Sequence, residues 1–245
     1  MHVRLFHSLP GTKIFKTSIM DQLHLATLPP VLRPAIDLIL NRTEAGGAET
    51  PFLFLGNADA AKDLALLKRH GITHIVTAAF NPDDPKESVG AEYPAEFTYH
   101  EVQIIDSSDT DLRPHLGPCA DFIRDAKQVP ANRVFVHCKM GTSRSASLLL
   151  FYMMRDEGYS LRNALLHVMH ERSANPDAPY THPNRGFMAM LIEQEKAMAH
   201  DGSCSLTLSD YMSKEFSSGK NISHGPVSKP TPRCSAVVGR LEANQ

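Results

Sequence analysis

The sequence predicts an α/β domain whose central sheet is mixed, mostly parallel, and flanked by helices. Short apolar runs typical of strands alternate with segments of helical spacing across residues 50–200. Within them, residues 145–157 are apolar on every side, which indicates a helix buried in the middle of a domain. The chain has 245 residues, of which 42% are hydrophobic, and this is enough for a packed core in one or two domains.

The expected elements follow one another in a regular order. The apolar run at 51–55 predicts a short strand closed by Gly56, and residues 58–70 have helical spacing that ends at Gly71, a residue suited to a left-handed C-cap. A β-branched run at 72–79 predicts the next strand. The remaining elements are a long loop at 81–95, strands at 97–105 and 133–137, and helices at about 114–127, 145–157, 161–171 and 186–200.

Composition changes on both sides of this region. We interpret residues 1–49 as a partly ordered leader that contains one packing helix at about 31–41. The leader is basic and has no acidic residue before Asp21, so mitochondrial import is a minor alternative to a cytoplasmic location. Residues 201–245 are rich in Ser, Gly and Pro without an apolar period, which predicts a disordered Ser-rich tail.

Charge and cysteine usage exclude several classes of protein. The 25 Lys and Arg residues nearly balance 27 Asp and Glu residues, whereas non-specific nucleic-acid binding needs a basic surplus. The sequence has no apolar run approaching the roughly 18 residues of a membrane helix. Its four cysteines lie far apart without a CxxC pair, and its histidines are scattered. We therefore expect no disulfide scaffold, no bound metal, no other cofactor and a reducing compartment.

One segment carries the chemistry. His137 ends the strand at 133–137 and Cys138 follows it directly. Gly141 stands at the third loop position, and Arg144 and Ser145 open the buried helix. The loop residues are Lys139, Met140, Gly141, Thr142, Ser143 and Arg144.

A loop between a strand end and a helix start can turn its backbone N–H groups inward and bind an anion at the positive end of the helix dipole. Gly141 permits backbone angles that a side chain would forbid, and the planar guanidinium of Arg144 can hold two phosphate oxygens. A thiol at a helix N-terminus loses its proton more easily, so Cys138 is expected to be a thiolate able to attack phosphorus. The sequence therefore predicts a site for phosphoryl transfer.

Transfer to sulfur also needs an acid that protonates the leaving oxygen and later a base that activates water. Asp106, Asp109 and Asp111 all follow the strand at 97–105, and we favour Asp106 because it comes directly after the strand end. Thr110 or Asp111 is expected to cap the next helix.

These residues resemble a known family. His137-Cys138 followed by Arg144-Ser145, with Asp106 upstream, is similar to the dual-specificity protein phosphatases of the cysteine-dependent protein tyrosine phosphatase superfamily. The resemblance covers about residues 51–199 and includes Pro-Asn-Arg-Gly-Phe at 183–187. The loop residues Lys-Met-Gly at 139–141 look most similar to those of the slingshot-type cofilin phosphatases. The stretch 174–182 is longer than is usual in the family.

The resemblance implies hydrolysis of phosphotyrosine, phosphoserine and phosphothreonine in proteins through a cysteinyl-phosphate intermediate, without metal. It implies that Cys138 is the nucleophile, Arg144 the phosphate clamp and Asp106 the general acid and base. Ser145 matches the hydroxyl that hydrogen-bonds the thiolate, and His137 matches a residue that braces the loop. A phosphoprotein is the implied substrate, with a cofilin-like protein as one candidate.

Several readings stay open for individual residues and for the substrate. Asn184 either braces the loop or caps the final helix, and Lys139 either attracts anions or is simply solvated. The same chemistry could act on a phosphoinositide, a glucan or an RNA 5′-triphosphate. An inactive phospho-binding module is the alternative outside enzymes.

Overall fold

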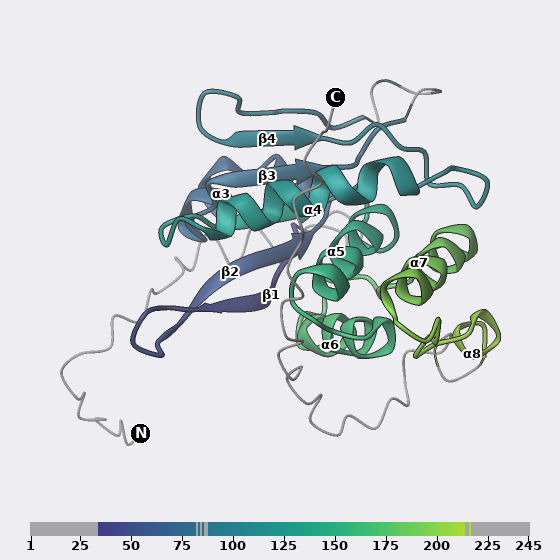
Figure 1. The fold of residues 1–245 in the computed structure, drawn as a ribbon. Helices are drawn as coiled ribbons and strands as arrows, with labels where there is room; N and C mark the ends of the chain where they lie inside the picture. Colours follow the sequence, from purple (N-terminus) through teal and green to yellow (C-terminus); the bar gives the residue numbers. More distant parts are fainter. Residues whose placement is uncertain (1–33, 82, 84, 86–87, 214–215, 217–245) are drawn as a thin grey trace, which may run out of the picture. The chain divides into compact units, whose positions relative to one another are not determined.

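A computed structural model of the chain describes residues 34–81, 83, 85, 88–213 and 216. The expectations for residues 1–33 and 217–245 lie outside these described residues. The described part contains the following strands and helices, labelled as in Figure 1: β1 (Ile36–Thr43), β2 (Glu49–Gly56), α2 (Ala58–Ala61), α3 (Leu64–Arg69), β3 (His74–Thr77), β4 (Thr98–Glu101), α4 (Arg113–Lys127), β5 (Val134–His137), α5 (Arg144–Arg155), α6 (Leu161–Ser173), α7 (Arg185–Met198) and α8 (Leu208–Tyr211).

The strands form one mixed sheet in the order β1-β2-β5-β3-β4. β1 and β2 are antiparallel, whereas β2, β5, β3 and β4 are parallel to their neighbours, which confirms the predicted mostly parallel sheet. The central strand β5 ends at His137, in register with Gly56 of β2 and Thr77 of β3. The carboxyl ends of three strands therefore meet at the edge where open α/β sheets bind ligands.

Helices cover both faces of this sheet. Alternate residues of β5 enter different clusters: Val134 and Val136 pack with α4 to α7, while Phe135 packs with α2 and α3. Figure 1 shows α5, α6 and α7 beside one another, and α5 is buried along almost its whole length, as its apolar sequence predicts. The strand and the helix on either side of the loop at 138–143 are thus held deep in the core.

The predicted helix at 31–41 is wrong where the structure describes it. Residues 36–43 form β1, which pairs with β2 through a turn that contains Gly46 and Gly47, both with positive φ. Their backbone angles, 114° and 85°, are those that glycine adopts without strain. Pairing with an adjacent apolar strand outweighs the local helical spacing in this segment.

The helix predicted at 58–70 is divided into α2 and α3. Asp63 interrupts it and caps α3, accepting a hydrogen bond from the Leu66 amide at 2.8 Å. The expected left-handed residue follows at Gly71, with φ of 67°. The strands predicted at 72–79 and 97–105 are shorter than expected, and the second of them ends at Glu101, so that a loop carries Asp106.

The prediction of disorder from residue 201 onward is wrong for residues 201–213 and 216. This stretch contains α8, whose N-terminus has a capping box between Thr207 and Asp210. Leu206, Tyr211 and Phe216 are buried. Averaging the composition over a long Ser-rich region hides three apolar residues at five-residue spacing, and these are enough to attach the segment.

Within the described ranges, no helix has both the length and the apolar character needed to cross a bilayer.

Candidate active site

The loop at 138–143 places Cys138 at its floor. All four side chains of β5 are buried, and the sulfur-bearing side chain of Cys138 directly after them is 1% exposed. The backbone amide of Gly141 donates to its Sγ at 3.1 Å, and the Ser145 hydroxyl donates to the same atom at 3.2 Å. Both donors stabilise negative charge on the sulfur. The loop therefore turns at least one amide inward, as an anion cradle requires.

Gly141 is required by this geometry. Its φ is 74°, and a Cβ added there would lie 2.4 Å from the carbonyl oxygen of Gly56 at the end of β2. A side chain would therefore both strain the backbone and collide with the neighbouring strand. The close approach brings the loop against the sheet edge.

Arg144 and Asp106 meet beside this loop. Arg144 is nearly buried, and its Nη1 donates to the carbonyl oxygen of Phe80 at 2.9 Å. Its Nε lies 3.6 Å from Oδ2 of Asp106. The phosphate clamp and the acid expected from the sequence are thus neighbours.

Asp106 is held by two further donors. Its Oδ1 accepts from the Ser143 hydroxyl at 2.7 Å and from Nδ2 of Asn184 at 2.8 Å. Asn184 also caps α7, because its Oδ1 accepts from the Phe187 amide at 2.9 Å. Both readings of Asn184 describe real contacts, since one amide group serves the helix and the acid together.

The other two candidate aspartates, Asp109 and Asp111, lie further along the loop between β4 and α4 that carries Asp106. Asp109 is exposed, and Asp111 pairs with Arg113 at the surface, with 2.8 Å between its Oδ1 and the Arg113 Nε. The N-cap position of α4 falls on Leu112, which makes no side-chain hydrogen bond, so the predicted position is off by one residue. Asp111 nevertheless caps the first turn, because its Oδ1 accepts from the Arg113 amide at 3.1 Å.

His137 is completely buried beneath the loop. Burial lowers its pKa to about 4, so its ring is neutral at neutral pH. The ring stacks on Phe135 at a centroid distance of 5.4 Å, and its Nδ1 lies 3.4 Å from the carbonyl oxygen of Cys138. It supports the floor of the site as a packed, uncharged ring.

The rest of the loop forms its rim. The carbonyl oxygen of Lys139 accepts from the Ala58 amide at 3.0 Å, and the Met140 side chain is exposed. The carbonyl oxygen of Thr142 accepts from the His182 amide at 2.9 Å. The long stretch 174–182 therefore ends directly against the loop at 138–143.

The sequence analysis missed the buried ion pair of Arg172 and Asp37, which supports the loop at 138–143 through the Gly141 carbonyl. Arg172 of α6 donates from Nη1 to the carbonyl oxygen of Gly141 at 2.6 Å and to the Thr181 hydroxyl at 3.0 Å. Its Nε lies 3.0 Å from Oδ2 of Asp37, and both side chains are almost inaccessible to water. A charged residue at the end of an amphipathic helix has no pattern that distinguishes burial from exposure. The available signal was Asp37, an acidic residue between apolar neighbours in a β-strand.

The fold and this geometry define a class: an α/β enzyme with a buried cysteine under a strand-to-helix loop, and with an arginine and a carboxylate beside that loop. The family model described as "Dual specificity phosphatase, catalytic domain" matches residues 53–197. The chain belongs to the dual specificity phosphatase family. It is a protein phosphatase, a hydrolase of the class that acts on phosphotyrosine and on phosphoserine or phosphothreonine.

Curated relatives confirm both the family and the similarity to Slingshot. Dual specificity protein phosphatase 1 of Arabidopsis thaliana is 33% identical over 195 residues, 78% of this chain and 87% of that protein. Protein phosphatase Slingshot homolog 3 of Rattus norvegicus is 36% identical over 154 residues, 63% of this chain. The match spans only 22% of the Slingshot protein's length.

Solved structures have the same fold. The human tyrosine phosphatase-like serine/threonine/tyrosine-interacting protein superposes with a TM-score of 0.54 at 29% identity, over 61% of this chain and 94% of that one. Human DUSP28 superposes with a TM-score of 0.50 at 31% identity, over 65% of this chain and 95% of that one.

Proposed function

We propose that Cys138, Arg144 and Asp106 carry out the phosphatase reaction in two steps. The observation that supports these roles is their convergence: donors from Gly141 and Ser145 meet at the sulfur, while Arg144 and Asp106 adjoin the same loop. Arg144 binds two oxygens of the incoming phosphate through its planar fork.

In the first step, the thiolate sulfur of Cys138 attacks phosphorus. The bond from phosphorus to the ester oxygen breaks, its electron pair leaves with that oxygen, and protonated Asp106 supplies a proton to it. In the second step, water attacks the cysteinyl phosphate while Asp106 accepts its proton. The sulfur–phosphorus bond breaks, the electron pair returns to sulfur, and the Ser145 hydroxyl stabilises the restored charge.

Substitution of the nucleophile tests the first role. Cys138→Ser should abolish turnover of every phosphomonoester and still bind phosphopeptide, measured by phosphate release and by isothermal titration. Cys204→Ser is the matched control, because Cys204 is a free, partly buried cysteine packed beside the core cluster. Phosphate release by Cys138→Ser at the wild-type rate would contradict the proposal.

Substitution of the proposed acid is tested by comparing two substrates whose leaving groups differ in their need for a proton. Asp106→Ala should lower kcat on phosphoserine peptides by about 10²- to 10⁴-fold, and much less on an activated aryl phosphate that needs no protonation. Asp109→Ala, from the same loop, is the control and should leave both rates unchanged. Equal losses of Asp106→Ala on the two substrates would show that Asp106 is not the acid.

For the substrate, we propose a cofilin-like phosphoprotein. The support is the loop sequence Lys139-Met140-Gly141 and the sequence identity to Slingshot homolog 3. A panel of phosphocofilin, a phosphotyrosine peptide, a phosphoinositide and triphosphorylated RNA checks this, and kcat/KM should be highest for phosphocofilin. A higher value for the lipid or the RNA would overturn it.

For the compartment, we propose the cytoplasm, because the nucleophilic sulfur reacts only while it is reduced. Cell fractionation that places the full-length chain in mitochondria would contradict this location.

A further inference from the structure

We propose that Tyr211, in the C-terminal segment, is a positioning residue for the acid: it holds Pro183, and through the adjoining Asn184 it fixes the carboxylate of Asp106. The inference rests on the proposed role of Asp106. It assigns a part in the reaction to a segment whose sequence indicates disorder.

The contact at the start of this chain is a buried hydrogen bond. The Tyr211 hydroxyl donates to the carbonyl oxygen of Pro183 at 2.6 Å, and the tyrosine is 1% exposed. Burial raises the pKa of Tyr211, so its hydroxyl keeps its proton and stays a donor across the working range of pH. Its ring also stacks on His182, with 5.0 Å between centroids and 25° between planes.

Three consecutive residues carry the contact to the site. The His182 amide donates to the Thr142 carbonyl at 2.9 Å, and the Asn184 amide donates to the Ser143 hydroxyl at 3.0 Å. Nδ2 of Asn184 then donates to Asp106. Pro183 lies between these residues, so Tyr211 holds the middle of a tripeptide that contacts the phosphate-binding loop twice and the acid once.

This tripeptide needs an external support. Its first residue, His182, ends the long stretch 174–182, which forms no helix or strand, and α7 begins only at Arg185. α7 holds Asn184 on one side, through the Phe187 and Met188 amides that donate to its side chain and its backbone carbonyl. The backbone on the N-terminal side of Asn184 depends on hydrogen bonds from outside the helix, and a buried carbonyl such as that of Pro183 requires a donor.

The C-terminal segment is anchored firmly enough to give that support. The buried carboxylate of Glu195 in α7 accepts from the Ser205 amide at 2.8 Å and from the Leu161 amide at 2.7 Å. The Arg162 Nε donates to the Ser205 carbonyl at 3.1 Å. Two core helices thus hold the segment that carries Tyr211.

Tyr211→Phe in the full-length chain tests the proposal, because it keeps the stacked ring and removes only the hydroxyl. If a hydrogen bond of ordinary net strength positions the acid, kcat on a phosphoserine peptide should fall about five- to tenfold. KM should stay unchanged, and the rate on p-nitrophenyl phosphate, whose leaving group needs no proton, should change less than about twofold.

Tyr180→Phe is the matched control. The Tyr180 hydroxyl also donates to a backbone carbonyl, that of Phe216 in the C-terminal segment. This carbonyl is not adjacent to Asn184, so the bond should not affect Asp106. Tyr180→Phe should leave the ratio of the two rates at the wild-type value. Equal losses on both substrates for Tyr211→Phe, no loss on either, or the same ratio change for Tyr180→Phe would each overturn the proposal.

A double variant shows whether Tyr211 acts through Asp106. Adding Tyr211→Phe to Asp106→Ala should cause no further loss on the phosphoserine peptide, whereas a merely structural residue would give an additional loss. The proposed function fails separately: it fails if Cys138→Ser still turns over, whatever Tyr211→Phe does.

Discussion

At the scale of single residues, the loop at 138–143 depends on one backbone conformation, the positive φ of Gly141. Gly141→Ala should lower the free energy of unfolding by about 1–3 kcal/mol, because alanine at this positive φ is strained and its Cβ would meet the Gly56 carbonyl. The displaced loop should also cost at least about tenfold in kcat/KM. Urea denaturation and turnover of an aryl phosphate measure the two effects.

Gly117 supplies the control for this prediction. It lies inside α4, and a Cβ added there meets nothing within 4 Å. Gly117→Ala should therefore raise the free energy of unfolding by about 0.5–1 kcal/mol, the usual gain in a helix interior. If Gly141→Ala behaved like Gly117→Ala, the loop would not need its left-handed residue.

The sequence identified the residues whose chemistry shows in a local pattern. Cys138, Gly141, Arg144 and Ser145 belong to one strand–loop–helix motif, so spacing along the chain predicted that they meet. Asp106 was predicted from its place after the strand at 97–105, and it meets them although that strand ends at Glu101 and a loop carries Asp106. Arg172 could not be found in this way. Two of its partners, Asp37 and Gly141, lie far away in sequence, and only the folded backbone brings them together.

At the scale of elements, β1 and α6 are joined by the buried pair of Asp37 and Arg172. Arg172→Met should lower the free energy of unfolding by about 3–5 kcal/mol, because it leaves the Asp37 carboxylate buried without its counter-ion. Asp37→Leu combined with Arg172→Met should recover much of this loss, since neither charge then remains. Urea denaturation of the two single variants and the double variant gives the coupling energy, and strict additivity would contradict the prediction.

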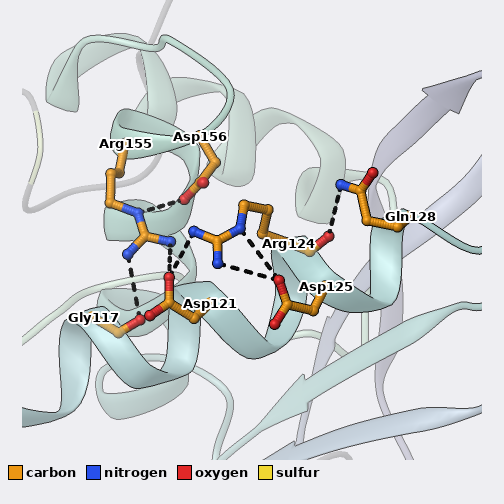
Figure 2. Close-up of polar contacts among 7 residues, drawn as sticks. All are labelled: Gly117, Asp121, Arg124, Asp125, Gln128, Arg155 and Asp156. Atoms are coloured by element: carbon orange, nitrogen blue, oxygen red, sulfur yellow. Dashed lines mark hydrogen bonds and ion pairs between the residues drawn. The ribbon is translucent and has the colours of Figure 1, made fainter. Parts of the chain in front are cut away.

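An exposed network provides the contrast. Figure 2 shows Asp121 of α4 between Arg124 and Arg155, at 2.7 Å and 2.9 Å, so that it links α4 to α5. All three side chains are a quarter exposed or more, and water screens such pairs. Asp121→Ala should cost no more than about 1 kcal/mol in urea denaturation. A cost equal to that of Arg172→Met would mean that burial does not set the strength of these ion pairs.

The elements themselves were predictable where local and tertiary preferences agree. The apolar α5 and the strand before it were expected close to their observed bounds, because both are buried on all sides. β1 was mistaken for a helix, because apolar residues spaced for a helix can equally line a strand once a partner strand is present. Its partner β2 follows directly after the two-glycine turn, and this hairpin signal outweighs the helical one.

At the scale of the whole molecule, the boundary of the domain could not be read from composition. The Ser-rich C-terminal region looks uniform over 45 residues, yet its first part contributes Leu206 and Tyr211 to the core. Whether a polar segment stays attached depends on a few buried side chains and on donors such as Ser205, and an average over the region cannot detect either.

The whole molecule should also lose stability in mildly acidic solution. Burial lowers the pKa of His70, His74 and His100, and it lowers that of His137 from 6.5 to about 4. In the unfolded chain these histidines become protonated near pH 6.5, whereas in the folded chain they become protonated only at lower pH. The stabilisation is therefore complete above about pH 6.5 and declines as the pH falls toward 4.

His137 should account for the largest share, about 3 kcal/mol over the whole interval. Urea denaturation between about pH 7 and about pH 5 isolates the histidines, because carboxylates in the unfolded chain titrate mainly below that range. In His137→Asn the free energy of unfolding should fall less steeply with pH than in the wild type, whereas His100→Asn should change the slope less. An unchanged slope in His137→Asn would show that the buried ring under Cys138 is not held neutral by the fold.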